Sequence, residues 1–352
     1  MVTSRNKPVD IARGIAMIAI VLGHLGLSGI DRVVYTFHIP IFYLITGYYS
    51  KTAENIGTVV KKRFRQLIVP YYLACVGVII FSCLFNNVGN EVYGIGKNTP
   101  VLSVLIQQVY ASLYGSGDTY TEPFIIIRIG AIWFLWATFW GVIFLNLIQK
   151  IKPVYRIFLV LGLFAAGYYT RLICWFPLSI QAGCCATLFM YIGASIKEIK
   201  ADYDYASSEI KISLFIISLC AWINFIQQYQ SFALVKCDIG RGPLDVIGSL
   251  CACYVLIIIC KGIEKKTRFL SKGLQFLGRY SLIVLVAHII ELNTFPWALL
   301  TYPFAIRGYG AITQYSVLIG GKFIWIIGVT IICARTNCIR RLFGMKPLDN
   351  MK

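Results

Sequence analysis

The chain has 352 residues, of which 58% are hydrophobic and 14% are charged. Soluble domains carry about 25% charged residues, so this chain is too apolar to cover a surface that faces water. The composition excludes a soluble enzyme, a disordered chain and a disulfide-rich secreted domain, and it indicates an integral membrane protein. The net charge of +18 does not indicate a nucleic-acid partner, because the bases form short clusters between apolar runs, as in helices oriented in a bilayer.

Long apolar stretches follow one another along the chain. A helix needs roughly 20 apolar residues to cross the hydrocarbon core of a bilayer, and lipid cannot satisfy an unpaired backbone. The sequence therefore predicts an all-α integral membrane protein with about ten transmembrane helices. The predicted spans are 11–29, 35–50, 67–86, 132–148, 154–170, 178–196, 211–229, 246–261, 280–300 and 312–334.

The distribution of basic residues predicts the orientation of these spans. With the N-terminus inside, 25 of the 33 Lys and Arg residues fall on inner segments, from Arg5 at the start to Lys346 and Lys352 at the end. Lys and Arg are retained on the cytoplasmic side of a membrane. Both termini are therefore predicted to be cytoplasmic, with a short tail at about 335–352, in a multi-pass protein of the plasma or inner membrane.

One apolar patch does not fit the span pattern. Residues 101–114 are too few for a span, and a span there would reverse every later loop, so a re-entrant or interfacial helix is predicted. The N-terminal apolar run is not typical of a cleavable signal peptide, because it contains Arg13 and His24. With no internal repeat or appended soluble domain visible, residues 1–352 are predicted to form a single membrane domain.

The three histidines, His24, His38 and His288, all lie in or at the ends of apolar segments. Ionisable residues inside a span are costly and are therefore candidates for function, although a histidine can also simply hydrogen-bond between helices. Glu291 follows His288 at i+3, so the two share a helix face. Glu291 could hold one tautomer of the imidazole, or the pair could only satisfy each other's hydrogen bonds.

The first span carries a polar stripe. Arg13 precedes His24 by eleven residues, almost three whole turns, so both are expected on one face roughly 16 Å apart along the axis. Asp10 lies one turn before Arg13 and can pair with it. Arg13 could instead extend to the headgroups. His24 lies deeper, and a neutral imidazole has a nitrogen that can take a proton from a hydroxyl, as a general base does.

Five motifs in order resemble the acyltransferase-3 family over nearly the whole chain, and look most like its short sugar O-acetyltransferases of the fucose 4-O-acetylase-like kind. The motifs are D-I-A-R-G-I-A-M-I-A-I-V-L-G-H (Asp10 to His24), F-H-I-P-I-F-Y-L-I-T-G-Y (Phe37 to Tyr48), K-K-R-F-R-Q-L-I-V-P-Y (Lys61 to Tyr71), I-W-F-L (Ile132 to Leu135) and L-G-R-Y-S-L-I-V-L-V-A-H (Leu277 to His288).

The resemblance implies roles for individual residues. His24 would be catalytic, with Arg13 and Asp10 supporting it. The residues implied to bind donor or acceptor are His38, Arg63, Arg65, Trp133, Ser281, His288 and Glu291. Arg63 and Arg65 suit the phosphates of an acyl-CoA, although anchoring at the inner face explains them equally. Trp133 is as well explained by packing. The chain departs from the family at Leu285, where a Tyr is usual.

The function implied by the resemblance is O-acyl transfer in the membrane. An acyl group, in the simplest case acetyl from acetyl-CoA, would pass to a hydroxyl of a cell-surface or lipid-linked glycan. No bound cofactor is expected, and no metal either, because the chain lacks H-E-x-x-H and ligand spacing among its cysteines. The alternative is a secondary transporter or flippase for a lipid-linked sugar that uses intramembrane His and Glu. That class is typically built on inverted repeats.

Overall fold

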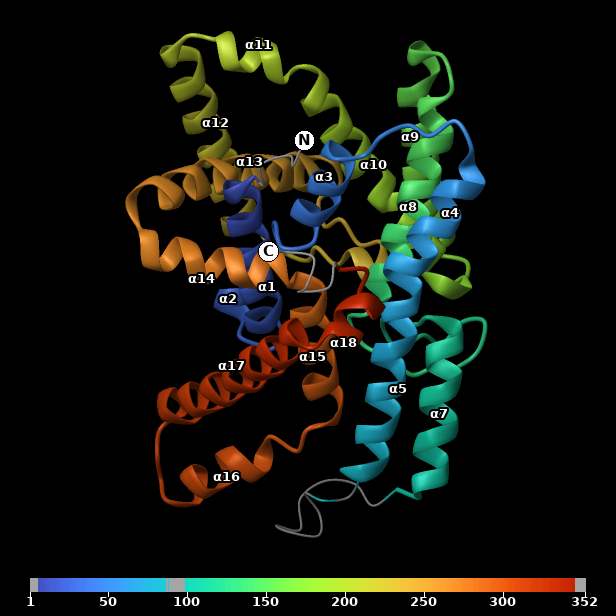
Figure 1. The fold of residues 1–352 in the computed structure, drawn as a ribbon, viewed down its shortest axis with the longest axis vertical. Helices are drawn as coiled ribbons and strands as arrows, with labels where there is room; N and C mark the ends of the chain where they lie inside the picture. Colours follow the sequence, from blue (N-terminus) through green and yellow to red (C-terminus); the bar gives the residue numbers. More distant parts are fainter. Residues whose placement is uncertain (1–5, 87, 89–98, 346–352) are drawn as a thin grey trace. The chain divides into compact units, whose positions relative to one another are not determined.

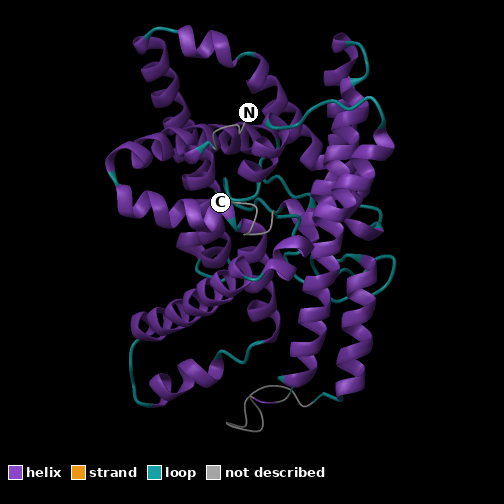
Figure 2. Cartoon of the chain, in the orientation of Figure 1, coloured by secondary structure: helices purple, strands orange, loops and turns teal. Residues whose placement is uncertain are grey.

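The structure is a computed structural model that describes residues 6–86, 88 and 99–345. Arg5, Lys346, Lys352 and the end of the predicted tail lie outside the described residues. The order of the elements can be followed in Figure 1. Over the described residues Figure 2 shows helices and loops and no strand, and the β-pairing there consists of isolated bridges. The prediction of an all-α protein is confirmed.

Six helical segments are long and apolar enough to cross a membrane. Two of them are composite: residues 56–84 join α4 (Ile56–Arg63), a π-helical segment η1 (Phe64–Ile68) and α5 (Val69–Leu84), and residues 177–198 join η2 (Pro177–Ser179) and α10 (Ile180–Glu198). The other four are α9 (Pro153–Thr170), α12 (Ser208–Gln227), α13 (Pro243–Lys266) and α17 (Ala311–Arg335). A seventh span would consist of α14 (Arg268–Arg279) and α15 (Ser281–Thr294), which are bent by 75°. The protein is therefore a multi-pass membrane protein.

Helices also lie at the remaining predicted spans, but they are shorter. α1 (Lys7–Gly23) and α8 (Trp133–Gln149) have 17 residues each, or about 25 Å at 1.5 Å per residue. α3 (Pro40–Tyr48) has only nine, because Pro40 starts a new helix after the turn at 35–39. The count of ten transmembrane helices is not confirmed and stays a prediction.

The chain divides into two compact units. The first comprises residues 1–61, 137–176 and 180–281, and the second comprises 62–136, 177–179 and 282–352. Each unit has its own packed helices and is described separately below. The prediction of a single membrane domain is not tested by this division.

The first unit is built around pairs of helices in close contact. It contains α1, α3, α9, α10, α12, α13 and α14, and in addition α2 (Ser28–Val34), α11 (Lys200–Tyr205) and η3 (Leu234–Lys236). α1 packs on α14, α10 on α3 and α9, and α12 on α13. Glycines allow the backbones to approach, since a Cβ added at Gly47 of α3 would lie 1.8 Å from the Met190 carbonyl oxygen of α10. These crossings fix α1, which carries His24 at its end.

The second unit combines α5, α7 (Val101–Tyr114), α15, α16 (Ala298–Ile306), α17 and α18 (Asn337–Leu342). α7 coincides with the apolar patch predicted as a re-entrant or interfacial helix, and its place in a membrane stays a prediction. The Tyr71 hydroxyl of α5 donates a 2.7 Å hydrogen bond to the Ser112 carbonyl of α7. The indole of Trp325 on α17 donates to the Ala287 carbonyl of α15 at 3.1 Å. These bonds hold neighbouring helices together where apolar contacts alone would allow sliding.

Candidate functional site

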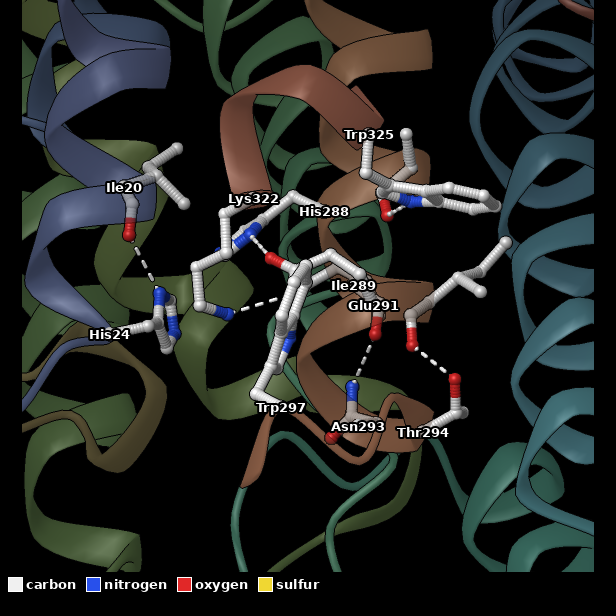
Figure 3. A network of polar contacts seen from close by, with 12 residues as sticks. Ile20, His24, His288, Ile289, Glu291, Asn293, Thr294, Trp297, Lys322 and Trp325 are labelled. Carbon is white, nitrogen blue, oxygen red and sulfur yellow. Dashed lines mark hydrogen bonds and ion pairs between the residues drawn. The ribbon is translucent and has the colours of Figure 1, made fainter. Parts of the chain in front are cut away.

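His24 is the residue at which α1 ends. The helix runs to Gly23, and His24 caps it with its backbone N–H on the last turn. His24 is half-buried, and its Nδ1 atom lies 2.7 Å from the Ile20 carbonyl oxygen one turn earlier (Figure 3). A carbonyl oxygen can only accept, so Nδ1 must carry the hydrogen. In the neutral ring the proton-accepting nitrogen is therefore Nε2.

Tyr35 joins His24 and His38 in the first unit. Its hydroxyl donates to the Gly23 carbonyl at 3.2 Å, and its ring meets the His38 ring edge-on with centroids 4.9 Å apart. Gly23 makes room for this contact, because a Cβ there would lie 3.2 Å from the Tyr35 ring. The end of α1 and the turn after α2 thus bring two predicted site residues to one junction. The sequence analysis did not single out Tyr35.

His38 is oriented in the same way as His24. The buried ring has Nδ1 2.7 Å from the Val34 carbonyl oxygen, so this ring also carries its hydrogen on Nδ1. The turn that contains His38 is hydrogen-bonded to α12, because the Trp222 indole donates to the Thr36 hydroxyl at 2.8 Å. The Phe37 ring packs edge-on against the same indole. Trp222 of α12 therefore holds the turn that carries His38 in place.

Asp10 and Arg13 lie toward the other end of α1. Asp10 is buried and Arg13 is half-buried. The unbroken helix between Arg13 and the His24 cap spaces them by about 16 Å along the axis. α14 crosses α1 at this level, with Gly278 against the Asp10 backbone. The predicted pairing of Asp10 with Arg13 stays a prediction.

A second polar cluster lies in the second unit, on α15, α17 and the connection that follows α15. His288 Nδ1 donates to Glu291 Oε1 at 2.7 Å, as the i+3 spacing predicts. The Lys322 ammonium and the Trp297 indole both donate to Glu291 Oε2 at 2.6 Å (Figure 3). Lys322 and Trp297 were not among the predicted site residues, although a lysine in the middle of an apolar span is itself a signal.

The other predicted site residues have local surroundings. Arg63 donates to the Gln66 amide oxygen at 3.3 Å, and Arg65 is exposed in the π-helical segment. Trp133 is buried at the start of α8, edge-on to Phe134. Ser281 begins α15 at the bend after α14. Their roles in binding stay predictions.

The described part of the chain contains no group of three or more His, Cys, Asp or Glu side chains placed to hold a metal ion. The groups available for chemistry are oriented imidazoles and a buried carboxylate that accepts three hydrogen bonds. Such groups transfer protons and stabilise charge.

Comparison with models of protein families places the chain in a known family. A family model described as an acyltransferase domain, that of the acyltransferase-3 family, matches residues 6–335. The match covers His24, His38, the His288–Glu291 pair and Lys322. No curated protein and no solved structure matches the chain.

Proposed function

The chain belongs to the acyltransferase-3 family, and we propose that this membrane acyltransferase moves an acetyl group from acetyl-CoA to a hydroxyl of a cell-surface or lipid-linked glycan. The proposal includes ten transmembrane helices, cytoplasmic termini and a place in the plasma or inner membrane. The charge asymmetry along the chain supports this orientation. It would leave the donor on the side where acyl-CoA is made.

The orientation of His24 is the observation that carries the proposal. The Ile20 carbonyl accepts from Nδ1 and thereby directs the basic lone pair to Nε2, as the carboxylate does for the histidine of a hydrolase triad. The ring also stands at the end of a helix, and the residue is only partly buried, which supports access by a substrate.

Direct transfer needs few groups. Nε2 of His24 takes the proton of the acceptor hydroxyl while the oxygen attacks the thioester carbonyl. The carbon–sulfur bond then breaks, and the imidazolium returns the proton to the departing CoA sulfur, so atoms and charge balance. In the alternative, Nε2 attacks the thioester carbonyl, the carbon–sulfur bond breaks and CoA leaves as the thiolate. The acyl group on the imidazolium then passes to the acceptor hydroxyl, whose proton goes to the thiolate.

Other predicted residues would bind the two substrates. Arg63 and Arg65 suit the phosphates of acyl-CoA, because guanidinium groups pair with phosphate oxygens. Trp133 and Ser281 remain candidates for the donor or acceptor. His38, held near the end of α1 through Tyr35, is proposed to face the acceptor. Arg13 is proposed to support the charge of the donor.

Release of free CoA by the purified protein tests this function. Full-length protein in lipid nanodiscs is given acetyl-CoA with a panel of sugars and lipid-linked sugars, and the free thiol is measured. We expect thiol release only with an acceptor that has free hydroxyls, and none with its fully methylated counterpart. Movement of a labelled lipid-linked sugar across vesicles without thiol release would instead favour the transporter or flippase.

A further inference from the structure

The Glu291 carboxylate is the centre of a buried network in the second unit. His288 and Glu291 have no exposed surface, and Lys322 is 3% exposed. Glu291 accepts three hydrogen bonds of 2.6 to 2.7 Å, from His288, Lys322 and Trp297. The Lys322 ammonium also lies 5.0 Å from the centre of the Trp297 ring, close enough for a cation–π contact.

The donors define the charge state of the network. A carboxylate that accepts three hydrogen bonds, one from an ammonium, is held in its ionised form. An isolated charge in the apolar interior would be very costly, and the opposite charge of Lys322 offsets that of Glu291. Because an ionised carboxylate can only accept, His288 must donate from Nδ1. In the neutral ring, the unprotonated nitrogen is therefore Nε2.

The framework around this network holds its members in place. The Trp325 indole ties α17 to the Ala287 carbonyl, next to His288. Trp297 packs against the α17 backbone at Gly321, where an added Cβ would lie 2.9 Å from its ring. Lys322, the next residue of α17, thus reaches Glu291 from a fixed position.

We propose that Lys322 and Glu291 are positioning residues that hold His288 in its Nδ1–H form, so that Nε2 keeps a lone pair that accepts a hydrogen bond from a substrate hydroxyl during acyl transfer. This inference rests on the proposed function. Lys322 keeps Glu291 ionised, Glu291 fixes the tautomer and rotation of the ring, and Trp297 prevents the carboxylate from turning away. The competing explanation is an ion pair that only stabilises the helix packing.

A double substitution separates the two explanations. Lys322→Met and Glu291→Gln alone each leave a buried charge or donor without its partner, and both are expected to lower the midpoint of thermal unfolding. The double variant buries no charge, and removing both partners of a buried pair is often neutral for stability. We expect its midpoint to return toward the wild-type value. We also expect its acyl transfer to stay roughly 10- to 100-fold low, the loss that follows removal of the outer partner of a metal-bound histidine, where a carboxylate fixes the ring in the same way.

The tautomer of His288 can be read directly, because the chain has only three histidines. Full-length protein labelled with ¹⁵N-histidine in nanodiscs gives three ring systems by NMR, and His288→Gln identifies one of them. We expect the hydrogen on Nδ1 in the wild type and a mixture of tautomers in the double variant. Thr294→Val is the control, since it removes a local hydrogen bond to Ile290 on the same helix and should leave the His288 signals unchanged.

Two results would overturn the inference. One is a double variant with turnover within about twofold of the wild type, which would make the pair merely structural. The other is a wild-type His288 ring with its hydrogen on Nε2. Failure of the proposed function has a different signature, namely wild-type protein that releases no CoA with any acceptor while the tautomer is as expected.

Discussion

Replacing His24 with alanine is expected to lower acyl transfer by about 10²- to 10⁴-fold, the range seen when a general base is removed. The fold should be retained, because the half-buried His24 lies at the end of α1 and its bond to Ile20 is local. Acceptor-dependent CoA release measures the first effect. The midpoint of thermal unfolding in the same nanodiscs measures the second.

Two further variants distinguish the base from its surroundings. His24→Asn offers an amide N–H where Nδ1 stands but nothing that accepts a proton at the position of Nε2, so it is expected to be as inactive as His24→Ala. Leu25→Ala changes the neighbouring half-buried residue and should keep most of the activity. Wild-type turnover in His24→Ala would contradict the assignment of His24 as the base or acyl carrier.

The i+3 spacing was sufficient for one contact within a helix. The i+3 relation of His288 and Glu291 predicts a shared face, and the structure has the hydrogen bond. Apolar length likewise predicts where helices lie, since each of the ten predicted spans contains one. Whether a helix crosses a membrane depends on its length relative to the thickness of the hydrocarbon core. For the shorter helices α1, α3 and α8 the length alone does not decide it.

The contact of Lys322 with Glu291 could not be predicted from the periodicity of the sequence. The charge count leaves Lys322 among the eight bases that do not fall on inner segments, yet it is buried in the middle of α17. Its position in an apolar helix was a visible signal. Its partner was not visible, because Glu291 lies 31 residues earlier and only the packing of α15 with α17 brings them together.

The turn at 35–39 was missed for a different reason. Residues 35–50 are apolar almost throughout, and hydropathy does not distinguish a continuous helix from a turn followed by a short one. Pro40 was the available signal, because proline is favoured at the first position of a helix. Without that turn, Tyr35 would not reach the Gly23 carbonyl, and the junction between His24 and His38 could not be derived.

The crossing of α1 and α14 leads to the second large expected effect, which is on stability. A Cβ added at Gly278 would lie 1.8 Å from the Asp10 carbonyl oxygen, a distance that real structures do not tolerate. The obstacle is backbone, which cannot move aside as a side chain can. Gly278→Ala is therefore expected to destabilise the protein by about 3 kcal/mol, near the upper end for overpacking. The thermal midpoint of the purified protein measures this loss.

Gly273 provides a matched control on the same helix, because a Cβ added there meets nothing within 4 Å. Alanine is the better helix former, by about 1 kcal/mol, so Gly273→Ala should leave the midpoint unchanged or raise it. A wild-type midpoint in Gly278→Ala would show that α14 does not approach α1 this closely.

Gly14 extends the argument to the opposite side of the same crossing. A Cβ added at Gly14 would lie 2.1 Å from the Leu274 carbonyl oxygen, and one added at Gly278 would lie 3.0 Å from the Gly14 nitrogen. Either substitution alone already separates the two helices. The double variant should therefore lose less stability than the sum of the single losses, as expected for sites in contact. Strict additivity would mean that the two glycines do not share a contact, and α1 would then need another support for the position of Arg13.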